Sequence, residues 1–191
     1  MNDFTQISGN IRPGNTALYA LKSLLSLIGI KVAHPSQDES LFYETDAKAQ
    51  WRHYDRELAF YQSIASSPFH IVYNDSPIDT EIATQIIYAM LKNRPILMTG
   101  APNFAESLAP LPRDTIKKHI HYVHSINLAD LELTELSMLL AKLKPVDYSF
   151  SKQEKVLMRA LIRAHFRGIL AESREARLAK SRSPIRPTEE V

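Results

Sequence analysis

The residues most suited to chemistry in this 191-residue chain gather in a short acidic segment. Asp75, Asp79 and Glu81 lie in a loop and at the start of a predicted helix, and Gln85 follows one helical turn later. Carboxylates at a helix N-terminus also complement the helix dipole, so capping is the simpler alternative to a chemical role. The segment is a candidate for carboxylate chemistry or for a helix cap alone.

A second candidate is the loop after the first predicted strand. It contains glycines, the hydroxyl of Ser8 and the cation of Arg12, and it leads into a helix N-terminus. These groups suit a phosphate or another anion. The loop matches neither a GxGxxG motif nor a P-loop, so an ordinary turn between a strand and a helix is the alternative.

Histidines form the third group. His119, His121 and His124 lie within one predicted strand. The chain has no cysteine and no paired carboxylates at ligand spacing there, so we expect polar alternation rather than a metal site. His34 follows another strand, and we expect it at the carboxyl end of the sheet, where it is well placed for a substrate.

A basic row runs along the last predicted helix. Lys155, Arg159, Arg163 and Arg167 recur every four residues and so share one helix face. A solvated face is the expected outcome, and an acidic partner or nucleic acid is the alternative.

The elements that must position these residues follow from hydrophobic periodicity. Short apolar runs alternate with helical patterns over the first 100 residues, as in βα units with a parallel sheet. We expect strands at 4–8, 30–33, 69–73 and 95–99, with 119–127 as a fifth candidate, and a proline-rich connection over 101–113. We expect helices over 18–28, 47–66, 79–93, 131–143 and 151–179. The last opens with a capping box formed by Ser151 and Glu154.

The predicted fold is therefore α/β: a Rossmann-like (flavodoxin-like) parallel sheet of four or five strands flanked by helices, with a helical C-terminal extension. We expect the α/β domain at 1–130, the extension at 131–179 and a disordered tail at 180–191. Residues 152–191 hold ten Lys or Arg and five Glu, whereas the other 151 residues hold 13 basic and 16 acidic residues. The tail is basic and the body mildly acidic, although the formal net charge is only +2.

The sequence carries no recognisable targeting or membrane-spanning segment. No apolar run approaches the ~18 residues of a membrane span, and no signal peptide is recognisable. The expectation is a cytoplasmic protein that makes no use of a membrane.

Two segments resemble a known enzyme family. The loop Gly9-Asn10-Ile11-Arg12-Pro13-Gly14 is similar to the phosphate loop of deoxynucleoside 5'-monophosphate N-glycosidases. The third βα unit resembles nucleoside 2-deoxyribosyltransferases: Asp79 opens its helix, Gln85-Ile86-Ile87-Tyr88-Ala89 follows six residues later, and Asn93-Arg94-Pro95 precedes the next strand. A second family aspartate falls on Asp55. The resemblance covers roughly residues 4 to 100.

The chain departs from that family at the central position. Gln85 stands where the family has its nucleophilic glutamate, and Ile87 replaces a glycine. A neutral amide is a poor nucleophile and does not stabilise an oxocarbenium ion as a carboxylate does. Glu81 lies one turn earlier on the same helix face and offers a carboxylate ~5.4 Å from the expected place.

The resemblance implies a nucleoside 2-deoxyribosyltransferase-like protein that acts on, or binds, a nucleoside or nucleotide at its N-glycosidic bond. Ser8, Gly9, Asn10, Arg12, His34 and Tyr88 would bind substrate, and Asp55, Asp79, Glu81 and Gln85 would act at the sugar. Such chemistry requires no metal or cofactor. A homo-oligomer is compatible with the sequence, and nucleic acid is not the expected partner. The substitution at Gln85 leaves the alternative open: a non-catalytic nucleotide-binding or interaction module that uses its pocket or its basic helix.

Overall fold

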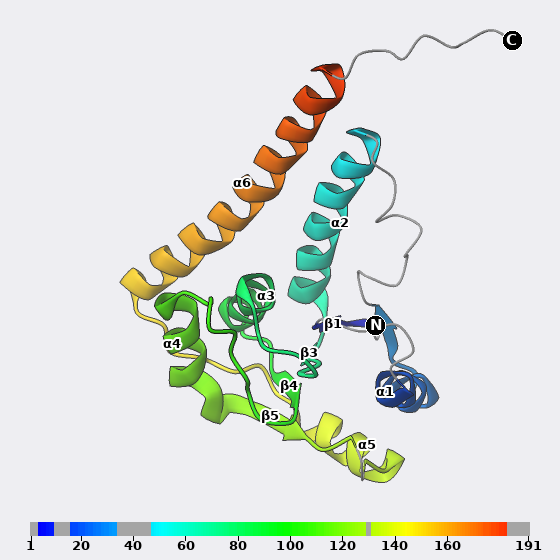
Figure 1. Ribbon diagram of the computed structural model, residues 1–191. Helices are drawn as coiled ribbons and strands as arrows, with labels where there is room; N and C mark the ends of the chain where they lie inside the picture. The colour runs from blue at the N-terminus through cyan, green and yellow to red at the C-terminus, as the bar shows by residue number, and fades with distance from the viewer. Residues whose placement is uncertain (1–3, 10–15, 34–46, 129–130, 183–191) are drawn as a thin grey trace, which may run out of the picture.

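The computed structural model describes residues 4–9, 16–33, 47–128 and 131–182. Five parallel strands form one sheet in the order β2-β1-β3-β4-β5 (Figure 1). The strands are β1 (Phe4–Ser8), β2 (Lys31–Ala33), β3 (His70–Val72), β4 (Ile96–Thr99) and β5 (Val123–Ile126). This is the flavodoxin-like order, and it confirms the predicted fold class.

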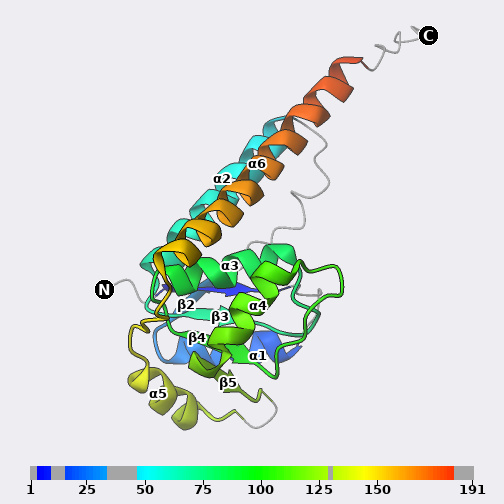
Figure 2. The ribbon, with the colours of Figure 1, turned by 90° about the vertical axis from the view of Figure 1, so that its left-hand side faces the viewer.

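Helices cover both faces of this sheet (Figure 2). The described helices are α1 (Thr16–Leu27), α2 (Ala47–Ser66), α3 (Thr80–Leu91), α4 (Pro110–His119), α5 (Leu133–Lys142) and α6 (Lys152–Arg182), with a 3-10 turn at Ile120–Tyr122. One hydrophobic cluster joins α2, α3, α4 and α6 to the sheet, and a second joins α1 and α5 to the opposite face.

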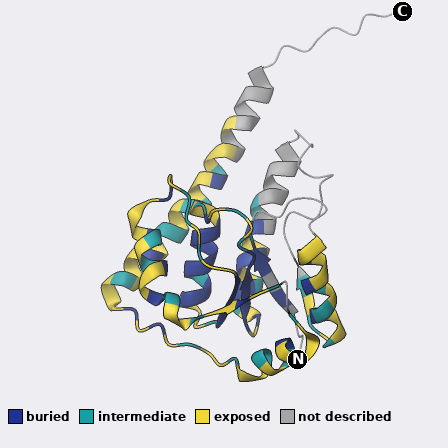
Figure 3. Ribbon diagram, turned by 60° about the horizontal axis from the view of Figure 1, so that its bottom comes forward, coloured by how far each residue is buried: buried dark blue, intermediate teal, exposed yellow. Residues whose placement is uncertain are grey.

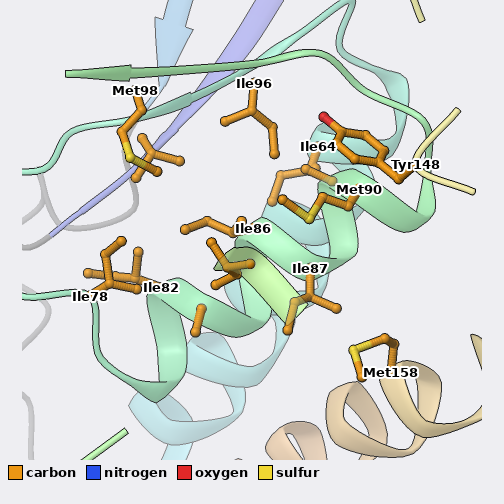
Figure 4. Close-up of a cluster of buried hydrophobic side chains, with 14 of the residues drawn as sticks. Ile64, Ile78, Ile82, Ile86, Ile87, Met90, Ile96, Met98, Tyr148 and Met158 are labelled. Carbon is orange, nitrogen blue, oxygen red and sulfur yellow. The ribbon is translucent and has the colours of Figure 1, made fainter. Parts of the chain in front are cut away.

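Successive side chains of a strand contribute in turn to one cluster and to the other. In β4, Ile96 and Met98 belong to the first cluster and Leu97 to the second, because successive side chains in a strand point to opposite faces. Ile86 and Ile87 of α3 lie in the first cluster as well (Figure 4). The central strands are consequently buried on both sides, while the outer sides of the helices are exposed (Figure 3). This explains why β3 and β4 are mostly apolar in the sequence, with the polar side chains of His70 and Thr99 buried as well.

One helix of the structure was not predicted from the sequence. Residues 101–113 were expected to be a connection, but α4 begins at Pro110 and contains Pro112. Proline is well tolerated in the first turn of a helix, where the missing N–H has no intrahelical partner. The fifth strand is accordingly shorter than predicted: His119 ends α4, and only Val123–Ile126 is strand.

The C-terminal helix α6 packs against the helices that cover one face of the sheet. It contacts α2 and α3, and its Met158 is fully buried in the first cluster. The predicted capping box is present, since Glu154 N donates to Ser151 Oγ (3.1 Å) and Ser151 N donates to Glu154 Oε2 (2.8 Å). The helix continues to Arg182, so the first three residues of the expected disordered tail are helical. Helices α2 and α6 run side by side and extend beyond the sheet (Figures 1 and 2).

None of the described helices is both long enough and apolar enough to cross a membrane.

Candidate functional site at the carboxyl edge of the sheet

The topology itself singles out one place on the molecule. From β1 the chain crosses to β2 on one side, whereas β3 lies on the other side of β1 and leads on to β4. The β1/β3 boundary is therefore the point where the direction of winding reverses. In open parallel sheets, ligands bind beyond the carboxyl ends of the strands at such a point.

At this boundary β1 and β3 approach each other very closely. Tyr73 N donates to Ser8 O at 2.8 Å. Gly9 has a φ of +146°, and a Cβ at this residue would lie 2.3 Å from the carbonyl oxygen of Tyr73. Glycine is thus required here both by its backbone conformation and by the space available. The predicted substrate residue Ser8 is buried, and its hydroxyl is 2.8 Å from His70 Nε2.

Helix α3 follows β3 and therefore begins at the same carboxyl edge of the sheet. Asp79 is the N-cap residue, and its Oδ1 accepts a hydrogen bond from Ile82 N at 2.9 Å. Asp79 therefore caps helix α3, which was the simpler of the two roles considered for this carboxylate. Helix α3 contacts β1 as well as β4.

Two further predicted residues meet on α3. Gln85 is buried, and its Nε2 donates to Glu81 Oε1 at 3.3 Å. Partial desolvation raises the pKa of Glu81 to about 7, and repulsion from the carboxylates of Glu57 and Asp79 adds to the rise. The Glu81 side chain is nevertheless exposed at the surface, so water screens part of this repulsion and limits the desolvation. The site presents a carboxyl group that changes protonation near neutral pH.

Sequence analysis missed two residues of this site, Glu57 of α2 and His165 of α6. Glu57 Oε2 lies 3.6 Å from His165 Nε2, and both side chains are largely buried. These two atoms and the hydroxyl of Tyr61 have no hydrogen-bond partner among the described residues. The spacing of Tyr54, Glu57 and Tyr61 on one side of α2 was the available signal for Glu57. No comparable signal marks His165, whose place depends on how α6 docks.

The remaining residues predicted for the site lie elsewhere in the fold or outside its described part. Tyr88 packs its ring against Tyr61, with centroids 5.0 Å apart, and so belongs to the contact between α2 and α3. Asn10, Arg12 and His34 lie outside the described residues. Asp55 is within α2, but its side chain is likewise outside the part that the structure describes.

A shallow pocket lies next to the β1/β3 boundary, across the carboxyl ends of three strands. We call it the edge pocket. It has a volume of about 170 Å³, and it is lined by Tyr73, Asn74 and Asp75 after β3, Thr99 and Gly100 at the end of β4, and residues 126–128 at the end of β5. Asn74 N donates to Thr99 Oγ1 at 2.8 Å, which ties the two neighbouring loops together.

The three clustered histidines do not share one environment. His119 is buried against Phe150, with ring centroids 4.6 Å apart, and burial lowers its pKa. His121 and His124 are exposed. Within the described residues, no three His, Asp or Glu side chains gather in a way that could hold a metal ion.

The basic row of α6 is exposed along its whole length. Lys155, Arg159, Arg163 and Arg167 all face solvent, and none has an ion-pair partner among the described residues. The apolar contacts of α6 lie on its other side, through Met158 and its neighbours. The row is a separate surface from the carboxyl edge.

Comparisons of this chain with protein-family models, with curated proteins and with solved structures found no match.

Proposed function

We propose that this chain is a nucleoside 2-deoxyribosyltransferase-like protein that binds a nucleoside or nucleotide at the β1/β3 boundary, with the N-glycosidic bond near Glu81. The observation that carries the proposal is the pairing of Glu81 with Gln85 at the start of α3, beside Glu57, in a helix that contacts β1. It supports the correspondence drawn from the sequence, in which Gln85 occupies the nucleophile position. The flavodoxin-like strand order supports the location.

The chemistry available at this site depends on Glu81. Cleavage of an N-glycosidic bond leaves positive charge on the sugar and an electron pair on the departing base nitrogen. A carboxylate stabilises the first, and an acid that protonates the base assists the second. With a pKa raised to about 7, Glu81 is present in both forms near neutral pH. Gln85 is neutral and can only hold Glu81 or the ligand by hydrogen bonds.

A second candidate function is binding without turnover. Gln85 is buried and directs its amide nitrogen at Glu81, so the only carboxylate in reach on α3 is already engaged. A carboxylate displaced by one turn, ~5.4 Å, is far from the place that the family mechanism requires. Under this alternative the protein recognises the same ligand but does not break the bond.

Thermal unfolding in the presence of ligands tests the proposal. The panel is deoxynucleosides, their 5'-monophosphates, ribose 5-phosphate and a set of unrelated anions as controls. A ligand at about 100 times its Kd should stabilise the fold by ~2.7 kcal/mol. A saturable rise in Tm with a nucleoside or nucleotide is expected. Unchanged unfolding across the whole panel contradicts the proposal.

A further inference from the structure

We propose that Glu57 of α2 and His165 of α6 form a pH-sensitive contact, which holds α6 on α2 and α3 at mildly acidic pH and loosens as pH rises. The contact lies where these three helices meet, since each of them packs against the other two. The proposal concerns the attachment of the C-terminal helix. It therefore goes beyond the proposed function and holds whether or not a nucleoside binds.

Both residues occupy positions that helical spacing would give to apolar side chains. On α6, His165 belongs to the stripe that packs on the first hydrophobic cluster, with Met158, Leu161, Ile162 and Phe166. On α2, Glu57 precedes buried residues at spacings of three, four and seven: Phe60, Tyr61 and Ile64. Replacing a buried ion pair with well-packed apolar residues is often neutral or stabilising. Packing alone therefore does not require this pair, and what the pair adds is a charge that depends on pH.

The contact is close enough for an ion pair but makes no hydrogen bond. Glu57 Oε2 lies 3.6 Å from His165 Nε2, and the two side chains are 5% and 14% exposed. Neither atom has a hydrogen-bond partner among the described residues. The attraction therefore depends on charge, which His165 carries only when it is protonated. A neutral His165 leaves the buried carboxylate of Glu57 without the cation of this contact, and an uncompensated buried charge is costly.

The other ionisable groups close to the contact are acidic or neutral. Desolvation raises the pKa of Glu81 to about 7, repulsion from Glu57 and Asp79 adds to the rise, and His165 opposes it. Burial, followed by the negative charges of Glu57 and Glu81, raises the pKa of Tyr61, so this hydroxyl stays neutral. We call Glu57, Tyr61, Glu81 and His165 the three-helix junction.

The described cations nearest to this junction along α2, α3 and α6 are engaged or directed elsewhere. Lys92 Nζ lies over the ring of Tyr88, and it is eleven residues, or ~16 Å of helix, after Glu81. Arg94 donates to a backbone carbonyl of α2 that is eight residues after Glu57. The basic row of α6 faces solvent. Among the described residues, the cation that contacts the Glu57 carboxylate is thus the protonated form of His165.

Rising pH changes the charge of the junction in one direction. Each proton that leaves His165 or Glu81 makes the junction more negative, and none of its groups gains positive charge. The two losses act together, because one removes the partner of Glu57 and the other adds a second carboxylate beside it. Release of α6 relieves both costs by exposing the groups to water.

Glu81 gives the size of the effect. Its pKa is about 7 with α6 docked, against an ordinary 4.5, so the docked state binds more protons than the released state between these values. The stability that this proton contributes to docking is complete below pH ~4.5 and is lost as pH rises through ~7. Between pH 6 and pH 8 the equilibrium consequently shifts toward release by about tenfold.

Hydrogen exchange of the full chain at pH 6 and pH 8 measures this loosening. The quantity compared is the protection factor of the amides at 162–170, after correction for the intrinsic effect of pH on exchange. It should fall by about tenfold, and at both pH values it should remain below that of the β4 amides, as expected for local release of a helix. A change of less than twofold, a rise, or equal protection of α6 and β4 overturns the proposal.

Variants that each remove one carboxylate assign the effect to the junction. In Glu57→Gln and in Glu81→Gln the fall in protection should shrink to about threefold or less. Glu172→Gln is the matched control, because Glu172 is exposed on α6, seven residues after His165, and it should keep the tenfold fall. A tenfold fall in both junction variants, or an equal reduction in Glu172→Gln, overturns the proposal. If Glu57→Gln does not fold, the exposed Glu81 decides the comparison.

His165→Gln tests the histidine separately. Glutamine is neutral at every pH and can still donate a hydrogen bond. At pH 6 the variant should show several-fold lower protection of α6 than the natural chain, whereas at pH 8 the two should be nearly equal. A loss of the same size at both pH values would show that His165 serves packing alone, and it would overturn the proposal.

Discussion

Gln85 donates a hydrogen bond to Glu81, one turn earlier on α3, with 3.3 Å between the amide nitrogen and the carboxylate oxygen. Gln85, which the sequence resemblance aligns with a nucleophilic glutamate, is therefore a neutral residue hydrogen-bonded to a neighbouring carboxylate. Desolvation raises the pKa of Glu81, and repulsion from Glu57 of α2 adds to the rise. Acidic character is retained at the start of α3, but it is located one turn from where the sequence resemblance places it.

Replacing Gln85 with Glu should create or raise exchange of bases between deoxynucleosides. The change restores a carboxylate at the nucleophile position, whereas the natural chain is expected to show little exchange. Chromatography of a deoxynucleoside incubated with a second free base measures the new nucleoside. Fast base release by the natural chain that survives Gln85→Ala and is lost in Glu81→Ala would assign the role to Glu81 instead. Turnover that neither change affects would exclude both residues.

Glu81 should make the fold less stable as pH rises. Its pKa is raised to about 7 from an ordinary 4.5, so the folded state binds more protons than the unfolded state between these values. Stability contributed by the protonated form is complete below pH ~4.5 and is lost as pH rises through ~7. Glu81→Gln removes this loss and can still accept the bond from Gln85. The Tm of the variant relative to the natural chain should increase from pH 5 to pH 8, and a constant difference would contradict the shift.

Two glycine substitutions together test the close contact between β1 and the residue after β3. Gly9→Ala brings a Cβ 2.3 Å from the Tyr73 carbonyl oxygen at a φ of +146°, so we expect a loss of ~2–3 kcal/mol. Gly168→Ala, within α6 and with open space around it, should instead stabilise by ~0.5–1 kcal/mol. Urea unfolding measures both. Equal effects of the two changes would show that β1 and β3 are further apart than described.

Most of the sheet was predictable because its signals are local. Strands β3 and β4 are buried on both faces, so they appear in the sequence as short, mostly apolar segments bounded by turn residues. The capping box at Ser151 was predictable for the same reason, since its two partners are three residues apart. Helix α4 was missed because Pro110 and Pro112 indicate a loop unless the first turn is known in advance.

The composition of the site was harder to predict because it depends on contacts between distant elements. The proximity of Glu81 and Gln85 follows from helical spacing alone. Glu57 and His165 come from α2 and α6, 108 residues apart in the chain, and their proximity requires the packing of those two helices. The edge pocket is assembled from three loops, and no single segment of the sequence carries its pattern.

The basic row on α6 should behave as a solvated face. Four aligned cations without ion-pair partners in the described part of the chain give weak, sequence-independent binding to DNA at low salt. Each phosphate contact releases counterions, so this binding should disappear near physiological ionic strength. Fluorescence anisotropy over a salt series measures it. Binding that persists at ~0.2 M salt and is abolished by Arg159→Glu with Arg163→Glu would identify a nucleic-acid interface instead.

The most direct test of the central claim is a backbone-amide NMR titration of the full chain with a deoxynucleoside and its 5'-monophosphate. The proposed site predicts saturable shifts concentrated at Gly9, Tyr73 and the first turn of α3 around Glu81, with the opposite face at α1 and α5 unchanged. Shifts confined to that opposite face or to the basic row of α6, or no saturable shift at all, would contradict a ligand site at the β1/β3 boundary.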